Sequence, residues 1–135
     1  MTVVYSTTAK NNRLQVISDL IAGKTIGSAT GTATAGSLVI GTAALSGATG
    51  VLATIALPTT PATVSNGVLT LAGTPLSAVA TATGTAALAE IRNSSGTVVL
   101  SGLTVGTSGA DLIIGTTSVT TGLTVQVNSG AITHG

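Results

Sequence analysis

The feature that most constrains this chain is a long interval without charge. Lys10, Arg13, Asp19 and Lys24 lie in the first 24 residues, and no Asp, Glu, Lys or Arg follows until Glu90. Threonine, serine, glycine and alanine fill that interval, together with valine, leucine and isoleucine. β-Branched side chains suit a pleated sheet, and glycines interrupt regular elements. The pattern therefore predicts many short strands separated by glycine-containing turns.

The 135 residues are enough for one domain with one core. We expect a mostly β fold, a single β-sandwich or jelly-roll-like domain with one short N-terminal amphipathic helix. The turn residues 93–96 lie between two apolar runs and predict a hairpin over 86–100. Pro58 and Pro61 enclose two threonines and predict a rigid exposed loop. The runs expected to form strands are 37–42, 51–57, 67–72, 86–92, 97–100, 112–116 and 123–127.

The first 24 residues form a distinct segment of the same domain, an arm and a helix, followed by a β domain at 25–135. The short run 2–5 is β-prone and is expected to be an arm or an edge strand. Apolar residues at helical spacing predict an amphipathic helix over 8–22, with Thr7 or Thr8 as its cap and Gly23 after its end. The apolar positions are Leu14, Ile17, Leu20 and Ile21.

Residues able to carry acid–base chemistry are few and scattered. Besides Asp19, the candidates are Glu90, Asp111 and the penultimate His134. Glu90 and Arg92 are two positions apart on a predicted strand and would share one face, so we expect them to form a modest surface ion pair. The pair would either stabilise the fold or lie at an interface. Asp111 is expected to be a turn or strand-entry residue. No catalytic set, metal site or cofactor motif can be assembled, and the sequence indicates a non-enzyme without cofactors.

Composition also argues against several partners. Four cationic side chains are too few for a nucleic-acid surface, and the chain has no cysteine for disulfides or thiolate metal sites. Residues 36–57 are long enough to span a bilayer as a helix, but they lack flanking cations and aromatic anchors. Threonines alternate at 30–34 and 81–85, as on an ice-binding sheet, but without a regular repeat. A small membrane protein and an ice-binding protein are therefore lower alternatives.

Charged residues on edge strands are a common protection against unwanted pairing, and residues 25–89 contain none. The sequence thus predicts that many edges and faces are covered by a partner, in an obligate or dense assembly. A monomer with a neutral, threonine-rich surface is the simpler alternative. Ultracentrifugation distinguishes these two predictions.

Five segments of the sequence carry a resemblance to a known family. They are VYSTTAKNNRLQVISDLIAG at 4–23, GSLVIGT at 36–42, VLTLAG at 68–73, GTAALAEIR at 84–92 and GTVVLSGLTVGT at 96–107. In these segments the sequence resembles the small decoration, or cement, proteins on the heads of tailed bacteriophages, and the likeness extends over nearly the full chain. It differs in an additional Gly/Thr/Ala-rich stretch around 27–35.

The resemblance implies a structural virion protein on the outer surface of the head, made in the host bacterial cytoplasm. Its partners would be the major capsid protein and itself, as a dimer or trimer, and it would stabilise joints between capsomers. The helix is a candidate docking element through Lys10, Arg13, Leu14, Ile17 and Ile21, unless its apolar residues only close the core. The alternative function is a phage tail or fibre module, or another adhesin.

Overall fold

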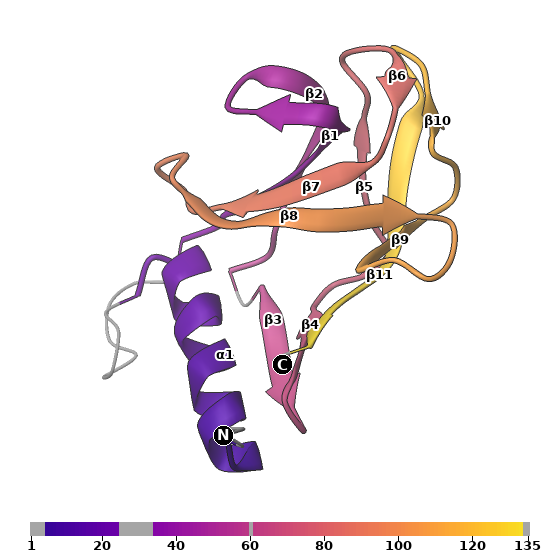
Figure 1. Cartoon of the computed structure of the whole chain (residues 1–135). Coiled ribbons are helices and arrows are strands. Elements are labelled where there is room, and N and C mark those ends of the chain that lie inside the picture. The colour runs from indigo at the N-terminus through magenta and orange to yellow at the C-terminus, as the bar shows by residue number, and fades with distance from the viewer. Residues whose placement is uncertain (1–4, 25–33, 60, 134–135) are drawn as a thin grey trace.

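The described part of the chain contains one helix followed by eleven strands (Figure 1). The computed structural model describes residues 5–24, 34–59 and 61–133. All seven runs predicted as strands overlap observed strands. The elements are α1 (Thr7–Ile21), β1 (Ser37–Ser46), β2 (Thr49–Ala56), β3 (Ala62–Ser65), β4 (Val68–Leu71), β5 (Leu76–Val79), β6 (Gly84–Thr85), β7 (Leu88–Arg92), β8 (Val98–Gly106), β9 (Leu112–Ile114), β10 (Ser118–Val119) and β11 (Thr124–Thr133).

Nine strands form one strongly curved sheet. The hydrogen-bonded order is β2-β1-β7-β8-β9-β11-β4-β3, and β5 also pairs with β11. All pairs are antiparallel except β8 with β9. The strands β6 and β10 form a separate two-stranded ladder. The predicted hairpin over 86–100 is confirmed, because β7 and β8 pair across the turn at 93–96.

The curvature brings strands that are distant in the sheet order around one apolar core. Leu38 and Ile40 of β1 belong to the same buried cluster as Leu112 of β9 and Val127 of β11. The protein is therefore a mostly β, β-sandwich-like domain with one helix. After β5, the backbone N–H of Thr81 donates to the carbonyl oxygen of Leu52 in β2 at 2.8 Å. The chain thus covers part of the β2 edge itself.

The helix α1 packs beside the β3–β4 hairpin at one end of the molecule (Figure 1). Ser6 caps it by accepting a hydrogen bond from Ala9 N–H at 3.2 Å, which corrects the predicted caps Thr7 and Thr8 by one and two residues. The chain leaves the helix through Gly23, whose φ of +69° favours glycine. The predicted helix end is confirmed.

The β3–β4 hairpin was not predicted, because the sequence pattern indicated a strand over 67–72 but none over the residues of β3. Pro58 and Pro61 do lie outside the strands, but Pro61 is buried, which corrects the prediction of a wholly exposed loop. The hairpin turns at Asn66 and Gly67, with φ of +52° and +75°. Asn-Gly is the preferred pair for a two-residue type I′ turn, so the sequence did contain a signal for this hairpin.

Two alternative interpretations of the sequence conflict with this architecture. Residues 36–57 form mainly the strands β1 and β2, and no helix in the described ranges is long and apolar enough to cross a membrane. In the stretch 81–85 only Gly84 and Thr85 belong to a strand, so its three threonines do not form a rank on one strand face. Of the stretch 30–34, only Thr34 lies within the described residues.

Candidate functional site

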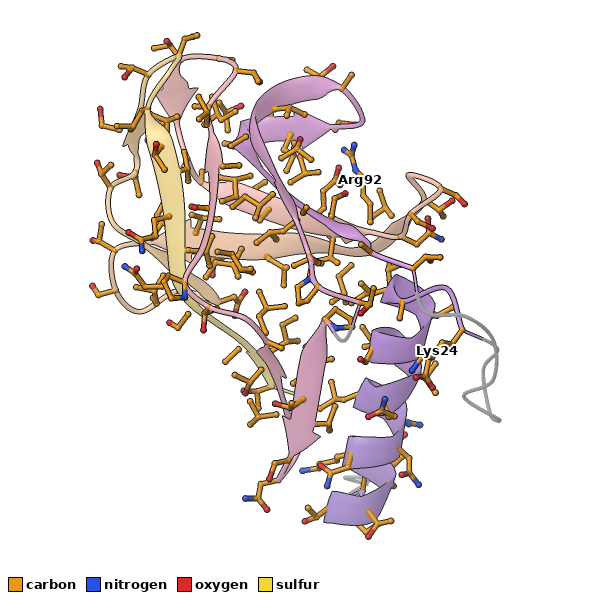
Figure 2. All side chains as sticks on the ribbon, turned by 180° about the vertical axis from the view of Figure 1, so that it is seen from behind. Lys24 and Arg92 are labelled. Atoms are coloured by element: carbon orange, nitrogen blue, oxygen red, sulfur yellow. The ribbon has the colours of Figure 1, made fainter. Side chains whose placement is uncertain are left out.

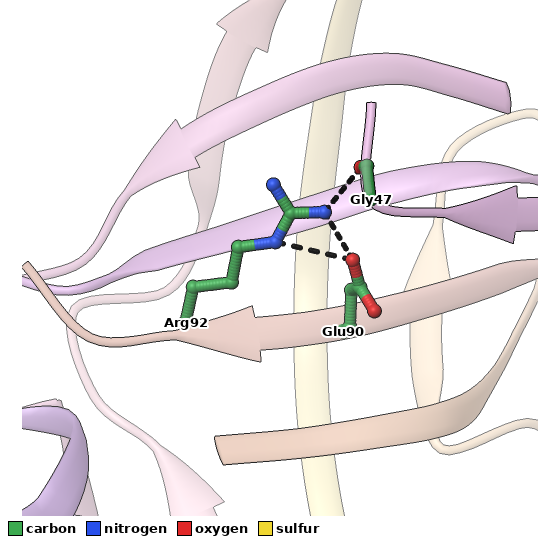
Figure 3. Close-up of polar contacts among 3 residues, drawn as sticks. All are labelled: Gly47, Glu90 and Arg92. Carbon is green, nitrogen blue, oxygen red and sulfur yellow. Dashed lines mark hydrogen bonds and ion pairs between the residues drawn. The ribbon is translucent and has the colours of Figure 1, made fainter. Parts of the chain in front are cut away.

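Between residues 34 and 133, leaving out residue 60, the charged side chains are Glu90, Arg92 and Asp111. Glu90 and Arg92 form the ion pair that their spacing predicted (Figure 3). Arg92 Nε donates to Glu90 Oε1 at 3.1 Å, and Nη2 contacts the same oxygen. Arg92 Nη2 also donates to the carbonyl oxygen of Gly47 at 2.6 Å. One guanidinium therefore joins β7 to the turn of the β1–β2 hairpin.

The pair was expected on the surface, but Glu90 is only 6% exposed. The β1–β2 ladder is irregular between Ile40 and Ser46, where the register shifts twice. Such irregularities bend a hairpin, and the carbonyl of Gly47 at its turn comes within reach of Arg92. Because little of either side chain is exposed, the main contribution of the pair is internal: it holds the hairpin turn against β7. A role at an interface stays a prediction.

The side chain of Asp111 forms hydrogen bonds with Thr104 at the edge of β8. Its Oδ2 accepts hydrogen bonds from the backbone N–H of Thr104 at 3.0 Å and from Thr104 Oγ1 at 3.2 Å. In return, Asp111 N–H donates to Thr104 Oγ1 at 3.0 Å. Of the residues of β8, Val105 and Gly106 are the ones that pair with β9. The carboxylate therefore accepts from a backbone N–H just before the paired segment. This arrangement agrees with the predicted strand-entry role, since β9 begins at the next residue.

The candidate docking residues of α1 separate into two groups. Leu14 is 1% exposed and Ile21 is 0% exposed, while Ile17 is half-buried against both apolar clusters of the protein. These three side chains are core residues with little or no surface for a partner, which corrects their candidacy for docking. The exposed Arg13 and half-buried Lys10 remain candidates, and the guanidinium of Arg13 lies 3.9 Å from the centre of the Tyr5 ring.

The other two charged residues of the N-terminal segment lie near the helix end. Asp19 is buried and accepts a hydrogen bond from Gln15 Nε2 at 3.2 Å. The backbone N–H of Lys24 donates to the carbonyl oxygen of Asp19 at 2.8 Å. Lys24 lies at the carboxyl end of α1, while Arg92 lies apart from it beside the β1–β2 hairpin (Figure 2). The helical end of the molecule therefore carries three cationic side chains, Lys10, Arg13 and Lys24.

Sequence reasoning missed the polar contact that joins the helix to the hairpin. The backbone N–H of Gly67 donates to Asn11 Oδ1 at 2.7 Å. Asparagine is a weak helix former, and Asn11 was therefore only a weak point in the predicted helix. Its position one residue after Lys10, on the side of α1 that faces β4, could not be recognised without the hairpin.

Within the residues that the structure describes, no group of three His, Cys, Asp or Glu side chains is placed to hold a metal ion. His134 and residues 2–4 of the predicted arm lie outside the described residues. The candidate functional region is therefore a neutral hydroxyl-rich β surface with a cationic helical end. Comparisons with protein-family models, curated proteins and solved structures found no match for this chain.

Proposed function

We propose that this protein is a structural virion protein that binds the outside of a tailed-phage head and stabilises the joints between capsomers. The proposal combines the resemblance in sequence to phage decoration proteins with the character of the surface. Its partners would be the major capsid protein and further copies of itself. Contacts of this kind need no single strong site, because each copy touches several neighbours and multivalency adds their effects.

One observation supports this proposal most strongly: the charges of the β part are used internally. Glu90 binds Arg92, Arg92 also binds the hairpin turn, and Asp111 binds Thr104. The exposed positions of the strands carry mainly threonine and serine, with isolated apolar side chains such as Val79 and Val98. A surface of this kind favours neutral contacts by close packing and strand addition.

The helical end adds a second, charged contact. Lys10, Arg13 and Lys24 give it a positive character that the β part lacks, so an acidic patch on the shell is the complementary partner. Exposed charges steer association more than they determine final affinity. We therefore expect the neutral β surface to retain the protein on the particle and the helical end to speed its arrival.

The test uses fluorescently labelled full-length protein and heads of the phage that encodes it, freed of their own copies. We expect binding to the head and retention in about 1 M NaCl, where the Debye length is only about 3 Å. Label at the tail would support the adhesin alternative and contradict the proposal. Release by salt at constant pH would contradict the neutral mode of attachment.

The contribution of the helical end is tested with Lys10→Ala and Arg13→Ala, which change side chains that are at least partly exposed. We expect slower association at low salt and little change in dissociation, measured by stopped-flow fluorescence. The matched control is Asn12→Ala on the same helix, which removes an exposed neutral side chain. An equal change in the control would show that the charges have no specific role.

A further inference from the structure

The turn between β3 and β4 exposes an asparagine beside a glycine. Ser65 pairs with Val68, so Asn66 and Gly67 alone form the loop, and both have positive φ. Asn66 is exposed, whereas Gly67 is buried against α1. A two-residue type I′ turn needs this pair of backbone conformations, and Asn-Gly adopts it with little strain. The turn thus places the most reactive type of asparagine sequence at the tip of a hairpin.

An Asn-Gly sequence can undergo deamidation without an enzyme. The backbone nitrogen of the glycine attacks Cγ of the asparagine, a C–N bond forms, and the side-chain amide nitrogen leaves as ammonia. Water then opens the resulting succinimide at one of its two carbonyls and yields aspartate or isoaspartate. Glycine permits the attack because it has no side chain to hinder the approach of its nitrogen.

In this protein the attacking nitrogen is held by the helix. Gly67 N–H donates to Asn11 Oδ1 at 2.7 Å, and a Cβ at Gly67 would lie 3.3 Å from Cδ of Lys10. To reach Cγ of Asn66, the peptide must rotate away from α1, which breaks this hydrogen bond and the turn conformation. We propose that Asn66 is a site of spontaneous deamidation and that Asn11 slows the reaction by holding the Gly67 amide.

The modification would change this end of the molecule in two ways. Aspartate at position 66 adds a negative charge to a hairpin that has none and that packs beside the cationic helix. Isoaspartate also adds a methylene to the main chain, and a two-residue loop cannot accommodate a longer backbone without changing the strand pairing. In the isoaspartate product, the pairing of Ser65 with Val68 and the contact with Asn11 would weaken together, so this product would loosen α1 from the β domain.

The experiment follows deamidation in the folded full-length chain at neutral pH by peptide mapping and mass spectrometry. Asn11→Ala is expected to raise the rate at Asn66 roughly fivefold, the factor that corresponds to one ordinary hydrogen bond. Alanine is the better helix former, so the change leaves α1 intrinsically stable. Asn11→Asp keeps an acceptor for the Gly67 amide, and we expect its rate to stay near that of the unmodified chain.

Asn128 is the control within the same molecule, because it is exposed, precedes Ser129 and lies on β11. If Asn11→Ala accelerates both sites equally, general unfolding is the cause and the proposal is overturned. An unchanged rate at Asn66 would overturn it as well. A second measurement compares the unmodified chain with Asn11→Ala when both are unfolded in urea. Asn66 should then react at the same rate in the two chains, and a difference that persists would contradict protection by the helix.

Discussion

The strand-rich end and the helical end of this molecule are stabilised in different ways. The large apolar cluster contains nineteen buried residues from strands, their connections and the end of the helix. The cluster beneath the helix contains only Leu14, Ala62 and Leu69, with a few half-buried neighbours. The curved sheet encloses the large cluster, whereas the small cluster is formed by the packing of α1 on the β3–β4 hairpin. Ile21, at the end of α1, belongs to the large cluster, so we expect only the part of the helix over the small cluster to open without global unfolding.

Charge follows the same division. Lys10, Arg13 and Lys24 belong to the helical end, while the described charges of the β part bind one another or the backbone. The strand-rich end thus offers a mainly neutral surface, and the helical end offers a charged one.

The largest effect is expected from Ile40→Ala in the large cluster. Ile40 is fully buried in β1, and its truncation leaves a cavity that a closed sheet cannot easily fill. We expect a loss of about 4 kcal/mol in the free energy of unfolding, measured by urea titration. Thr54→Ala, at an exposed position on the neighbouring β2, is the control and should change stability by less than about 0.5 kcal/mol.

Leu14→Ala tests whether the helical end is a separate unit. The substitution removes the helical side chain of the small cluster and should cost about 3 kcal/mol. We expect hydrogen exchange to accelerate in α1, β3 and β4 while β1 and β7 keep their protection. Leu20→Ala on the same helix is the matched control, since Leu20 is exposed. Loss of protection in β1 and β7 as well would show that the two ends unfold together.

Much of the strand-rich end could be predicted from sequence because its signals are local. β-Branched runs between glycines mark the strands, and the residues 93–96 mark the β7–β8 turn. The ion pair followed from the two-residue spacing of Glu90 and Arg92 alone. Its burial could not be predicted, because it depends on the bent β1–β2 hairpin, whose turn is distant from Glu90 in sequence.

The helical end was predicted in outline, and its role was left open between docking and closing the core. Helical spacing identifies Leu14, Ile17 and Ile21 as one face, but a single amphipathic face fits a core and a docking surface equally well. The choice depends on what lies opposite, and the β3–β4 hairpin was not recognised. Attention to Asn66 and Gly67 as a turn pair would have revealed that hairpin and, with it, the partner of the helix.

Glu90→Ala should have the next largest effect, because it leaves the guanidinium of Arg92 with only the Gly47 carbonyl among the partners seen here. Removing one partner of a mostly buried pair costs more than the pair contributes, and we expect a loss of about 2 kcal/mol. The double variant Glu90→Leu with Arg92→Met should recover part of this loss, since it leaves no unpaired charge. A double variant less stable than Glu90→Ala would mean that the Arg92–Gly47 tether is the larger contribution.

Asp111→Ala should have the smallest effect on stability, about 1 kcal/mol, because its hydrogen bonds to Thr104 lie near the surface. Its effect on association should be larger than its effect on stability. Loss of the carboxylate frees the Thr104 N–H on the edge of β8 just before the segment that pairs with β9, and a free edge is a template for strand addition. We expect faster self-association by light scattering in the variant. Asp111→Asn, which keeps a side-chain acceptor, should behave like the unmodified chain; equal aggregation of both variants would point to charge alone as the protection.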